Sequence, residues 1–550
     1  MLELGEITTG ICILAKKAHF VVTGLIWALF LLENGFAQVD SPQDNTTPSS
    51  SLQQSQDIPK NALWRFGKFG LRSDNNGYYA LAFSPNSKYL ATRNRNNFVS
   101  VYDTTTRKKL FELEGEDGLI KCLHFSPNSK SLLTGASGPG EKIKVWDIQS
   151  GKLITEFGDD PLQAFFTQDG KAISVLGPES LEFYASDNGS IMDRVKWKSN
   201  HNERRHTHSL DGQLVILSSN SLNQLQVLNT ETRAKTFLDG PNQQIKQVTL
   251  SHNKLWVAAS YNRDPKIRIW DLRDPSESKY ILNKHTQTVQ SLSFSPDGRF
   301  LLSTSWDDTA IVWDLLTREP VANLEGHKSN VNSSAFANSG LLLATGASGV
   351  KDSSAILWEL KPFLFDQEIP KAMDSFEVVW KELGSNFPTQ AFTAVNALVQ
   401  KPDRFLERLS QRLGVDLDKV SNEKIQQLIV QLDSPKYRER EFATEELMKI
   451  RGHADPQLQQ ALLTAPSTEV RYRINLILRP PVRRPKINFD ELRRLHRSVF
   501  ALELIGNEQA LDLLNSIGSG HANIDVALDA KSSAKRVREN LEESTTSNPQ

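Results

Sequence analysis

The densest group of possible metal ligands in the sequence is the stretch HNERRHTH at residues 201–208, which holds three histidines. His206 and His208 are two residues apart on a predicted strand, so their side chains share a face and could bind a transition metal or transfer a proton. In the repeat described below, these two positions correspond to Leu292 and Phe294, which are predicted core positions. We therefore interpret both histidines as core residues and predict no metal site.

Motifs that would indicate an enzyme do not occur in the sequence. We find no GxxxxGK[ST] loop, no HExxH pair, no GxSxG elbow and no glycine-rich dinucleotide loop after a strand. The acidic residues are scattered, and no two of them are placed in a way that indicates general acid and base catalysis. The sequence therefore predicts no catalytic residue, no cofactor and a protein that is not an enzyme.

Charge and cysteine content narrow the possible partners further. The 64 lysines and arginines balance 65 aspartates and glutamates, whereas proteins that bind nucleic acid usually carry a basic excess. We therefore predict no nucleic-acid partner. The two cysteines, Cys12 and Cys122, do not have the spacing of a metal-binding pair, and Cys122 lies in a predicted strand as a small core residue.

The N-terminus has the pattern of a secretory signal peptide. The apolar run FVVTGLIWALFLL at 20–32 follows Lys16 and Lys17 and precedes Gly35 and Ala37, small residues placed as at a signal-peptidase site. The run is shorter than the roughly 20 residues that span a bilayer. A signal peptide over 1–37 indicates a periplasmic or extracellular protein. The alternative is an uncleaved membrane anchor formed by residues 20–32.

The segment that follows is predicted to be a disordered linker. Residues 38–61 are rich in serine, glutamine, aspartate and proline and poor in apolar residues. Such a composition cannot bury enough surface to offset chain entropy, so we expect a flexible spacer.

A repeat of about 40 residues organises the next three hundred positions. Strings related to FSPDG begin at intervals of 41 to 44 residues, at Phe83, Phe125, Phe166, His208, Leu250, Phe294 and Phe336. Each unit shows four short apolar stretches, two of them flanking this turn, with polar turns between them. Period-two alternation bounded by glycine, proline, asparagine and aspartate is typical of strands, and four strands per unit are typical of a propeller blade.

The third strand of several units ends in a Trp-Asp dipeptide, and here the chain resembles the WD-repeat family. The matching or nearly matching dipeptides are Trp146-Asp147, Trp270-Asp271, Trp313-Asp314, Tyr102-Asp103 and Trp358-Glu359. The resemblance covers residues 62–363 and implies an all-β seven-bladed propeller. It also implies that the segment 62–70 supplies the fourth strand of the last blade, which would close the ring.

The same resemblance implies a buried tetrad in the sixth unit, made of His285, Ser303, Asp307 and Trp313. In the family these residues stabilise the fold, so we interpret the serine, histidine and aspartate as structural and not as a hydrolase triad. The seventh unit keeps His327, Thr345 and Trp358, but its turn is expanded.

Other units depart further from the pattern. The second unit has Glu116 in place of the histidine, while keeping Thr134 and Trp146. The third and fourth units lack the tryptophan, and we expect their blades to be the least regular.

From residue 364 the pattern becomes helical. Apolar residues recur at helical spacing through 364–530, and these helices are similar to HEAT-type repeats. The basic segment at 479–486 is predicted to be an exposed linker, and 531–550 a polar tail. A propeller followed by such helices resembles large exported WD-repeat proteins of bacteria.

These features predict a non-catalytic protein–protein interaction scaffold of the cell envelope or exterior. Its partners would be other proteins, with a membrane only if the N-terminal segment stays attached. The alternative is a propeller hydrolase or carbohydrate-binding protein that uses loops on one face, such as 137–142 or 348–354.

Overall fold

The computed structural model describes the chain from Ile58 onward, with gaps. The described residues are 58–66, 80–93, 98–113, 119–137, 140–158, 161–177, 180–196, 206–219, 224–273, 279–349, 351–413, 422–449, 451–463, 467–478, 488–520 and 523–546. The expected signal peptide at 1–37, the anchor segment at 20–32, most of the linker at 38–61, Glu116 and the basic segment at 479–486 therefore lie outside the described residues.

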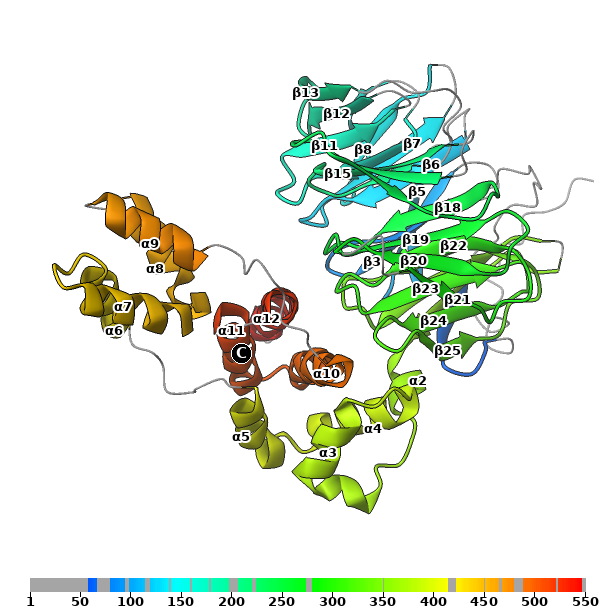
Figure 1. Cartoon of the computed structure of the whole chain (residues 1–550). Helices are drawn as coiled ribbons and strands as arrows, with labels where there is room; N and C mark the ends of the chain where they lie inside the picture. The colour runs from blue at the N-terminus through cyan, green and yellow to red at the C-terminus, as the bar shows by residue number, and fades with distance from the viewer. Residues whose placement is uncertain are drawn as a thin grey trace, which may run out of the picture. The chain divides into compact units, whose positions relative to one another are not determined.

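Seven antiparallel four-stranded sheets form the blades of a propeller, which confirms the predicted fold (Figure 1). Blades 1 to 3 contain β2 (Leu81–Phe83), β3 (Tyr89–Arg93), β4 (Val99–Asp103) and β5 (Lys108–Leu113); β6 (Leu119–Phe125), β7 (Ser131–Ser137), β8 (Ile143–Asp147) and β9 (Leu153–Phe157); and β10 (Gln163–Phe166), β11 (Ala172–Leu176), β12 (Ser180–Ala185) and β13 (Ile191–Lys196). Blades 4 and 5 contain β14 (His206–His208), β15 (Leu214–Ser219), β16 (Gln224–Asn229) and β17 (Lys235–Leu238); and β18 (Ile245–Leu250), β19 (Trp256–Tyr261), β20 (Ile267–Asp271) and β21 (Lys279–Leu282). Blades 6 and 7 contain β22 (Val289–Phe294), β23 (Phe300–Ser305), β24 (Ala310–Asp314) and β25 (Glu319–Leu324); and β26 (Val331–Phe336), β27 (Leu342–Ala347), β28 (Ala355–Glu359) and β1 (Ala62–Phe66).

The N-terminal strand closes the ring. β1 pairs with β28, with Phe66 opposite Ala355, so the first strand of the chain is the fourth strand of the last blade. Residues 58–61, which the composition assigns to the linker, already lie against this blade. Pro59 is so near Gly326 that a Cβ on the glycine would come within 2.1 Å of the proline ring.

The FSPDG-type turn has a local reason to recur. In blade 6 the Asp297 carboxylate accepts hydrogen bonds from the Ser295 hydroxyl and the Arg299 amide. The Ser295 hydroxyl oxygen also accepts from the Phe300 amide at 2.9 Å. Gly298 follows with φ of +71°, a conformation that glycine adopts without strain. Each such turn therefore reverses the chain between the first two strands of a blade.

The C-terminal region is helical, as predicted. It contains α2 (Lys361–Phe365), a 3₁₀ turn (Lys371–Asp374), α3 (Phe376–Leu383), α4 (Pro388–Gln400), α5 (Pro402–Arg412), α6 (Asn422–Gln431), α7 (Tyr437–Lys449), α8 (Arg451–Leu463), α9 (Thr468–Leu478), α10 (Phe489–Ile505), α11 (Glu508–Gly520) and α12 (Ile524–Thr546). Pro388 and Pro402 stand at the first turn of α4 and α5, where the missing amide hydrogen costs nothing. Gly506 ends α10 in the left-handed region.

The prediction of a polar tail at 531–550 is wrong for most of its length. α12 continues to Thr546 and buries one face. Ala530, Ala534 and Val537, at helical spacing, are at most 3% exposed. The many charged residues between them occupy the other faces of the helix, and they obscure the apolar stripe in the sequence.

One hydrophobic cluster joins the last two blades to most of the helices. It contains Phe300 of β23, Trp358 of β28, Phe392 of α4 and Phe500 of α10. The Phe300 ring lies 6.0 Å from the Phe392 ring and 5.9 Å from the Phe500 ring, centroid to centroid. Helices α6 to α9 have a separate cluster. The helical region is therefore packed on the propeller through α2 to α5 and α10 to α12.

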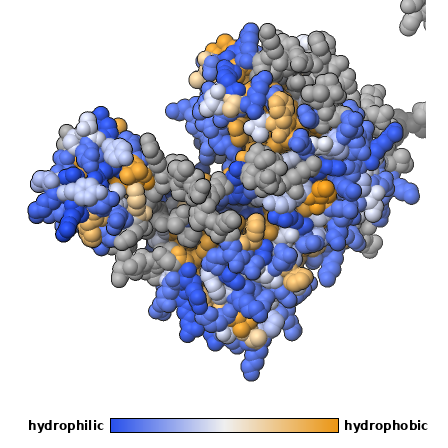
Figure 2. Space-filling model, viewed as in Figure 1, coloured by the Kyte–Doolittle hydropathy of each residue, from blue (hydrophilic) through white to orange (hydrophobic). Residues whose placement is uncertain are grey.

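The surface in view is mostly hydrophilic, with hydrophobic side chains in small separate groups (Figure 2). Large exposed hydrophobic side chains of the propeller lie on the outermost strands of blades 1 to 5: Leu110, Leu153, Ile154, Ile191, Met192, Phe237 and Ile281. Among the residues that the structure describes, no helix combines the length and the hydropathy needed to cross a bilayer.

Candidate functional site

The four residues of the sixth-unit tetrad form a continuous hydrogen-bonded chain. Trp313 Nε1 donates to Ser303 Oγ at 2.8 Å, and Ser303 Oγ lies 2.8 Å from His285 Nε2. The other ring nitrogen, Nδ1, lies 2.9 Å from Asp307 Oδ2. Strands β23 and β24 supply Ser303 and Trp313, while the turns before β22 and after β23 supply His285 and Asp307.

The burial of this tetrad favours the structural role that the family resemblance implies. Ser303 is fully buried and the His285 side chain has no exposed surface, so a substrate cannot reach the hydroxyl. Burial disfavours the charge of Asp307, but hydrogen bonds from His285 and Thr309 outweigh it and hold its pKa well below the usual range. The arrangement therefore satisfies the tryptophan N–H and a carboxylate inside the blade.

Blade 7 contains a second complete tetrad, of which the sequence identified His327, Thr345 and Trp358 but not the aspartate. His327 Nε2 lies 2.8 Å from Thr345 Oγ1, and Trp358 Nε1 donates to the same oxygen at 2.8 Å. The carboxylate comes from Asp352 in the expanded turn, whose Oδ2 is 2.8 Å from His327 Nδ1. Asp352 stands six residues before its tryptophan, as Asp307 does in blade 6, and that spacing could have identified it.

The second and fifth blades hold partial versions. In blade 2, Trp146 Nε1 donates to Thr134 Oγ1 at 2.9 Å. In blade 5 the position of the tetrad hydroxyl holds Ala259, and Trp270 Nε1 is buried with no hydrogen-bond partner within the described part of the chain. Asp264 there pairs with Arg268 at 2.9 Å.

Blades 3 and 4 keep four strands without the tryptophan. Tyr184 and Leu228 take its place opposite the second strand. His208 lies in β14 with its Nε2 2.7 Å from Ser174 Oγ of blade 3, whereas the side chain of His206 lies outside the described residues. The described residues contain no group of three histidines, cysteines or carboxylates that could hold a metal ion.

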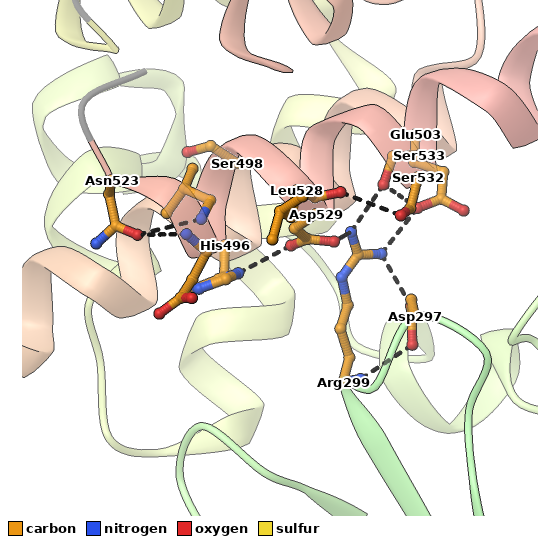
Figure 3. Close-up of polar contacts among 12 residues, drawn as sticks. Asp297, Arg299, His496, Ser498, Glu503, Asn523, Leu528, Asp529, Ser532 and Ser533 are labelled. Carbon is orange, nitrogen blue, oxygen red and sulfur yellow. Dashed lines mark hydrogen bonds and ion pairs between the residues drawn. The ribbon is translucent and has the colours of Figure 1, made fainter. Parts of the chain in front are cut away.

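A second polar site lies where blade 6 meets the helices, and we call it the seam (Figure 3). Arg299, in the turn between β22 and β23, is 7% exposed. Its guanidinium contacts Asp297 at 3.0 Å, Glu503 of α10 at 2.8 Å and Asp529 of α12 at 2.8 Å. It also donates to the Ser533 hydroxyl at 3.0 Å. One propeller arginine therefore joins both helices.

Cations surround Glu503 and Asp529 and favour the ionised forms of both carboxylates. Burial disfavours the charge of Glu503, but Arg299 and Arg536 outweigh it and lower its pKa. Burial likewise opposes the charge of Asp529, and Arg299 with His496 lowers its pKa. Arg536 Nε lies 2.6 Å from Glu503, and His496 Nδ1 lies 2.8 Å from Asp529. Breaking one pair would leave a buried charge uncompensated.

The Trp-Asp aspartates of blades 5 and 6 extend the seam. Asp314 accepts from Arg497 of α10 at 3.1 Å, and Arg497 also donates to the Leu383 and Ser385 carbonyl oxygens at 2.7 Å, at the C-terminus of α3. In blade 5, Arg273 contacts both Asp271 and Asp525 of α12 at 2.5 Å. Positions that recur in every repeat are thus used here to hold the helices.

No sequence signal pointed to the seam. The residue at the Arg299 position is Lys88 in blade 1, Lys130 in blade 2 and Lys171 in blade 3, all exposed. A basic residue after this turn is therefore ordinary in the repeat, and only the tertiary structure gives Arg299 its special role.

Comparison with known proteins agrees with the fold. Residues 107–147, 276–314 and 318–359 match the family model of the WD domain, G-beta repeat. The chain therefore contains WD40 repeats, and the structure arranges them as a seven-bladed propeller.

Curated relatives are similar to about half of the chain or less. The WD repeat-containing protein 26 homolog of Drosophila melanogaster is 24% identical over 296 residues, which cover 51% of this chain and 45% of that protein. Periodic tryptophan protein 2 of Arabidopsis thaliana is 25% identical over 259 residues, or 47% of this chain and 24% of that protein. The probable cytosolic iron-sulfur protein assembly protein CIAO1 homolog of Caenorhabditis elegans is 33% identical over 121 residues, or 20% of this chain and 35% of that protein.

The chain spans less than half the length of each of these three relatives. All three are eukaryotic, so they lend no support to the expected resemblance to exported bacterial proteins. Among solved structures, the β-propeller domain of Myceliophteria thermophila Cps50 (Swd1) aligns with a TM-score of 0.45 at 17% identity, covering 55% of this chain and 99% of that chain.

Proposed function

We propose that this protein is a non-catalytic protein–protein interaction scaffold that acts in the cell envelope or outside the cell. WD40 propellers are typical of such scaffolds, which supports the general class. The location is supported only by the signal-peptide pattern of residues 1–37. The intact mass of the protein purified from its native cells would test it, since removal of 37 residues is expected and an unprocessed chain would contradict it.

The proposal rests on one observation: among the described residues, the helical region occupies only one of the two ends of blades 5 and 6. Antiparallel order puts the turns after the first and third strands at one end and the other connections at the opposite end. In blades 5 and 6 the first end is occupied by the seam through Asp271, Arg299 and Asp314. The far end is then the face of these blades that remains for a partner.

Trp306 marks this far end. It lies in the turn after β23 and is half-buried. Its Nε1 donates to Asn332 Oδ1 at 3.1 Å, and Lys246 Nζ lies 5.5 Å from the ring. A fixed, partly exposed aromatic ring with polar neighbours is typical of the centre of a protein interface.

Affinity capture with three full-length proteins tests this function. We expect the wild type to retain a specific partner from the native extract, Trp306→Ala to lose at least 90% of it, and Phe237→Ala to retain it, because Phe237 lies on an outermost strand that the proposal does not use. Equal retention by both variants would reject the far end as the binding face. Turnover of a substrate by the wild type would reject a purely non-catalytic role.

The alternative as a carbohydrate-binding protein draws on the same surface. Asn332 donates to Ser348 Oγ at 2.5 Å, so the start of the 348–354 loop is connected to the Trp306 ring. Aromatic rings beside amides can bind sugars by stacking and hydrogen bonding. A hydrolase is less favoured, because Asp352 of this loop is committed to the blade 7 tetrad; the loop at 137–142 lies partly outside the described residues. Glycan-array binding that depends on Trp306 would favour the carbohydrate function.

A further inference from the structure

Neighbouring blades meet at a repeated position where the second strand of one blade faces the end of the first strand of the next. At six of the seven joints both residues are apolar and share a hydrophobic cluster. The pairs are Ala91–Phe125, Leu133–Phe166, Ile216–Leu250, Ala258–Phe294, Leu302–Phe336 and Ala344–Phe83. At the joint between blades 3 and 4 the same two positions hold Ser174 and His208, which form a hydrogen bond instead.

The geometry of this joint requires a neutral imidazole. Ser174 Oγ donates to the Phe165 carbonyl oxygen at 3.2 Å, so it accepts from His208 Nε2–H at 2.7 Å. His208 is 4% exposed, and its other nitrogen, Nδ1, has no hydrogen-bond partner among the described residues. A proton on Nδ1 would therefore place a buried charge without an acceptor.

The surroundings do not offer a free counter-charge. On the β6 side stands His124, whose Nδ1 accepts from the Phe166 amide at 3.2 Å across the joint between blades 2 and 3. On the turn after β14 stands Asp211, which already pairs with Lys254 at 2.5 Å. Burial lowers the pKa of His208 to about 3, with His124 adding to the effect and Asp211 opposing it.

Burial has the same effect on the imidazole of His124. Burial lowers its pKa to about 4, and His252 adds to the effect. The carboxylate that acts on His252 is Asp297, which is paired with Arg299 in the seam. Two consecutive joints on either side of blade 3 thus depend on neutral histidines, in the part of the ring where two blades have no Trp tetrad.

We propose that the joint between blades 3 and 4 is an acid-sensitive point of the ring, which opens locally when His208 takes up a proton. This goes beyond a scaffolding function and does not depend on it. Proton linkage fixes the direction of the pH dependence. Below the ordinary histidine pKa of about 6.5, His208 binds a proton in the open joint but not in the closed joint. The open population therefore rises as pH falls, by up to about tenfold per pH unit for each histidine.

Hydrogen exchange of the full-length protein at about pH 7 and about pH 5, corrected for the intrinsic pH dependence of amide exchange, tests the proposal. In the wild type we expect protection of β11 and β14 to fall at least about tenfold more than protection of β23 and β24, the control strands in blade 6. His208→Gln keeps a hydrogen-bonding amide beside Ser174 and removes the titration. Ser174→Leu combined with His208→Phe reproduces the apolar pair of blades 6 and 7.

Both variants should reduce the extra loss of protection at β11 and β14 to less than about threefold. The same tenfold loss in His208→Gln, or a uniform loss over all blades of the wild type, would overturn the proposal. If the double variant does not fold, His208→Gln alone decides, because it changes the titration with little change in side-chain volume.

Discussion

Blade 6 and blades 3 and 4 have the same four-stranded architecture, but their interiors are held by different chemistry. In blade 6, Trp313, Ser303, His285 and Asp307 form an uninterrupted hydrogen-bonded chain, and the blade also carries the helices through Arg299. In blades 3 and 4, Tyr184 and Leu228 replace the tryptophan. At the repeated joint position between these blades, the hydrogen bond from His208 to Ser174 replaces an apolar pair. The fold therefore does not require the tetrad in every blade.

The difference indicates what the tetrad adds. Strand pairing and turn chemistry, which all seven blades share, are enough to form a blade. The tetrad adds buried aromatic area and a satisfied polar network, and it occurs complete in blades 6 and 7, which support α2 to α5 and α10 to α12 through a common hydrophobic cluster. We infer that the blades with the most stabilised interiors are those on which the helical region packs.

Truncating a tetrad tryptophan should give the largest difference in stability between the two kinds of blade. Trp313→Ala should lower the free energy of unfolding by about 3–5 kcal/mol, because it leaves a large cavity and removes the donor to Ser303. Leu228→Ala, at the same position of blade 4, should cost about 2–3 kcal/mol. Urea denaturation of both variants measures the difference. An equal loss would mean that the two kinds of blade interior are equally strong.

The seam offers a second contrast between blades, with a smaller expected effect. Arg299→Ala should destabilise the protein by about 3 kcal/mol, because Glu503 and Asp529 would remain as buried, under-compensated carboxylates. The control is Lys130→Ala at the same turn position of blade 2, where the side chain is exposed and the cost should stay within about 0.5 kcal/mol.

Hydrogen exchange can localise the effect of the Arg299→Ala substitution. If the seam is what distinguishes blade 6, Arg299→Ala should also increase hydrogen exchange in α10 and α12 and leave β6 and β7 unchanged. A loss of protection confined to the propeller, with the two helices unaffected, would show that Arg299 stabilises the blade alone.

The repeat made the propeller predictable, because each blade uses the same turn and the same alternation of apolar residues. Asp352 could have been found too, since its distance from Trp358 equals the distance of Asp307 from Trp313. Arg299 could not, because exposed lysines occupy its position in the first three blades and nothing local distinguishes it. The end of α12 was missed since its buried stripe consists of small residues such as Ala530 and Ala534 among many charged ones. Contacts between distant segments, which leave no local pattern, account for what the sequence did not reveal.

Blade 5 offers the test with the smallest expected effect on stability. It has part of the tetrad, and so is intermediate between blade 6 and blades 3 and 4. It has Trp270 and Asp264 at tetrad positions, but Ala259 where blade 6 has Ser303 and Pro241 where blade 6 has His285. Trp270 Nε1 is buried without a hydrogen-bond partner within the described residues. Ala259→Ser should supply an acceptor for this N–H and raise the free energy of unfolding by about 1 kcal/mol, a typical net gain for a buried hydrogen bond. Urea denaturation measures the gain.

The matched control for this change places Ala259→Ser in a Trp270→Phe background, which lacks the indole N–H that the new hydroxyl would accept from. Relative to Trp270→Phe alone, the gain of about 1 kcal/mol should disappear. A gain that persists without the indole N–H would come from another contact of the serine. No gain in the presence of Trp270 would mean that the hydroxyl does not satisfy the indole nitrogen, and blade 5 would then differ from blade 6 by more than one missing hydrogen bond.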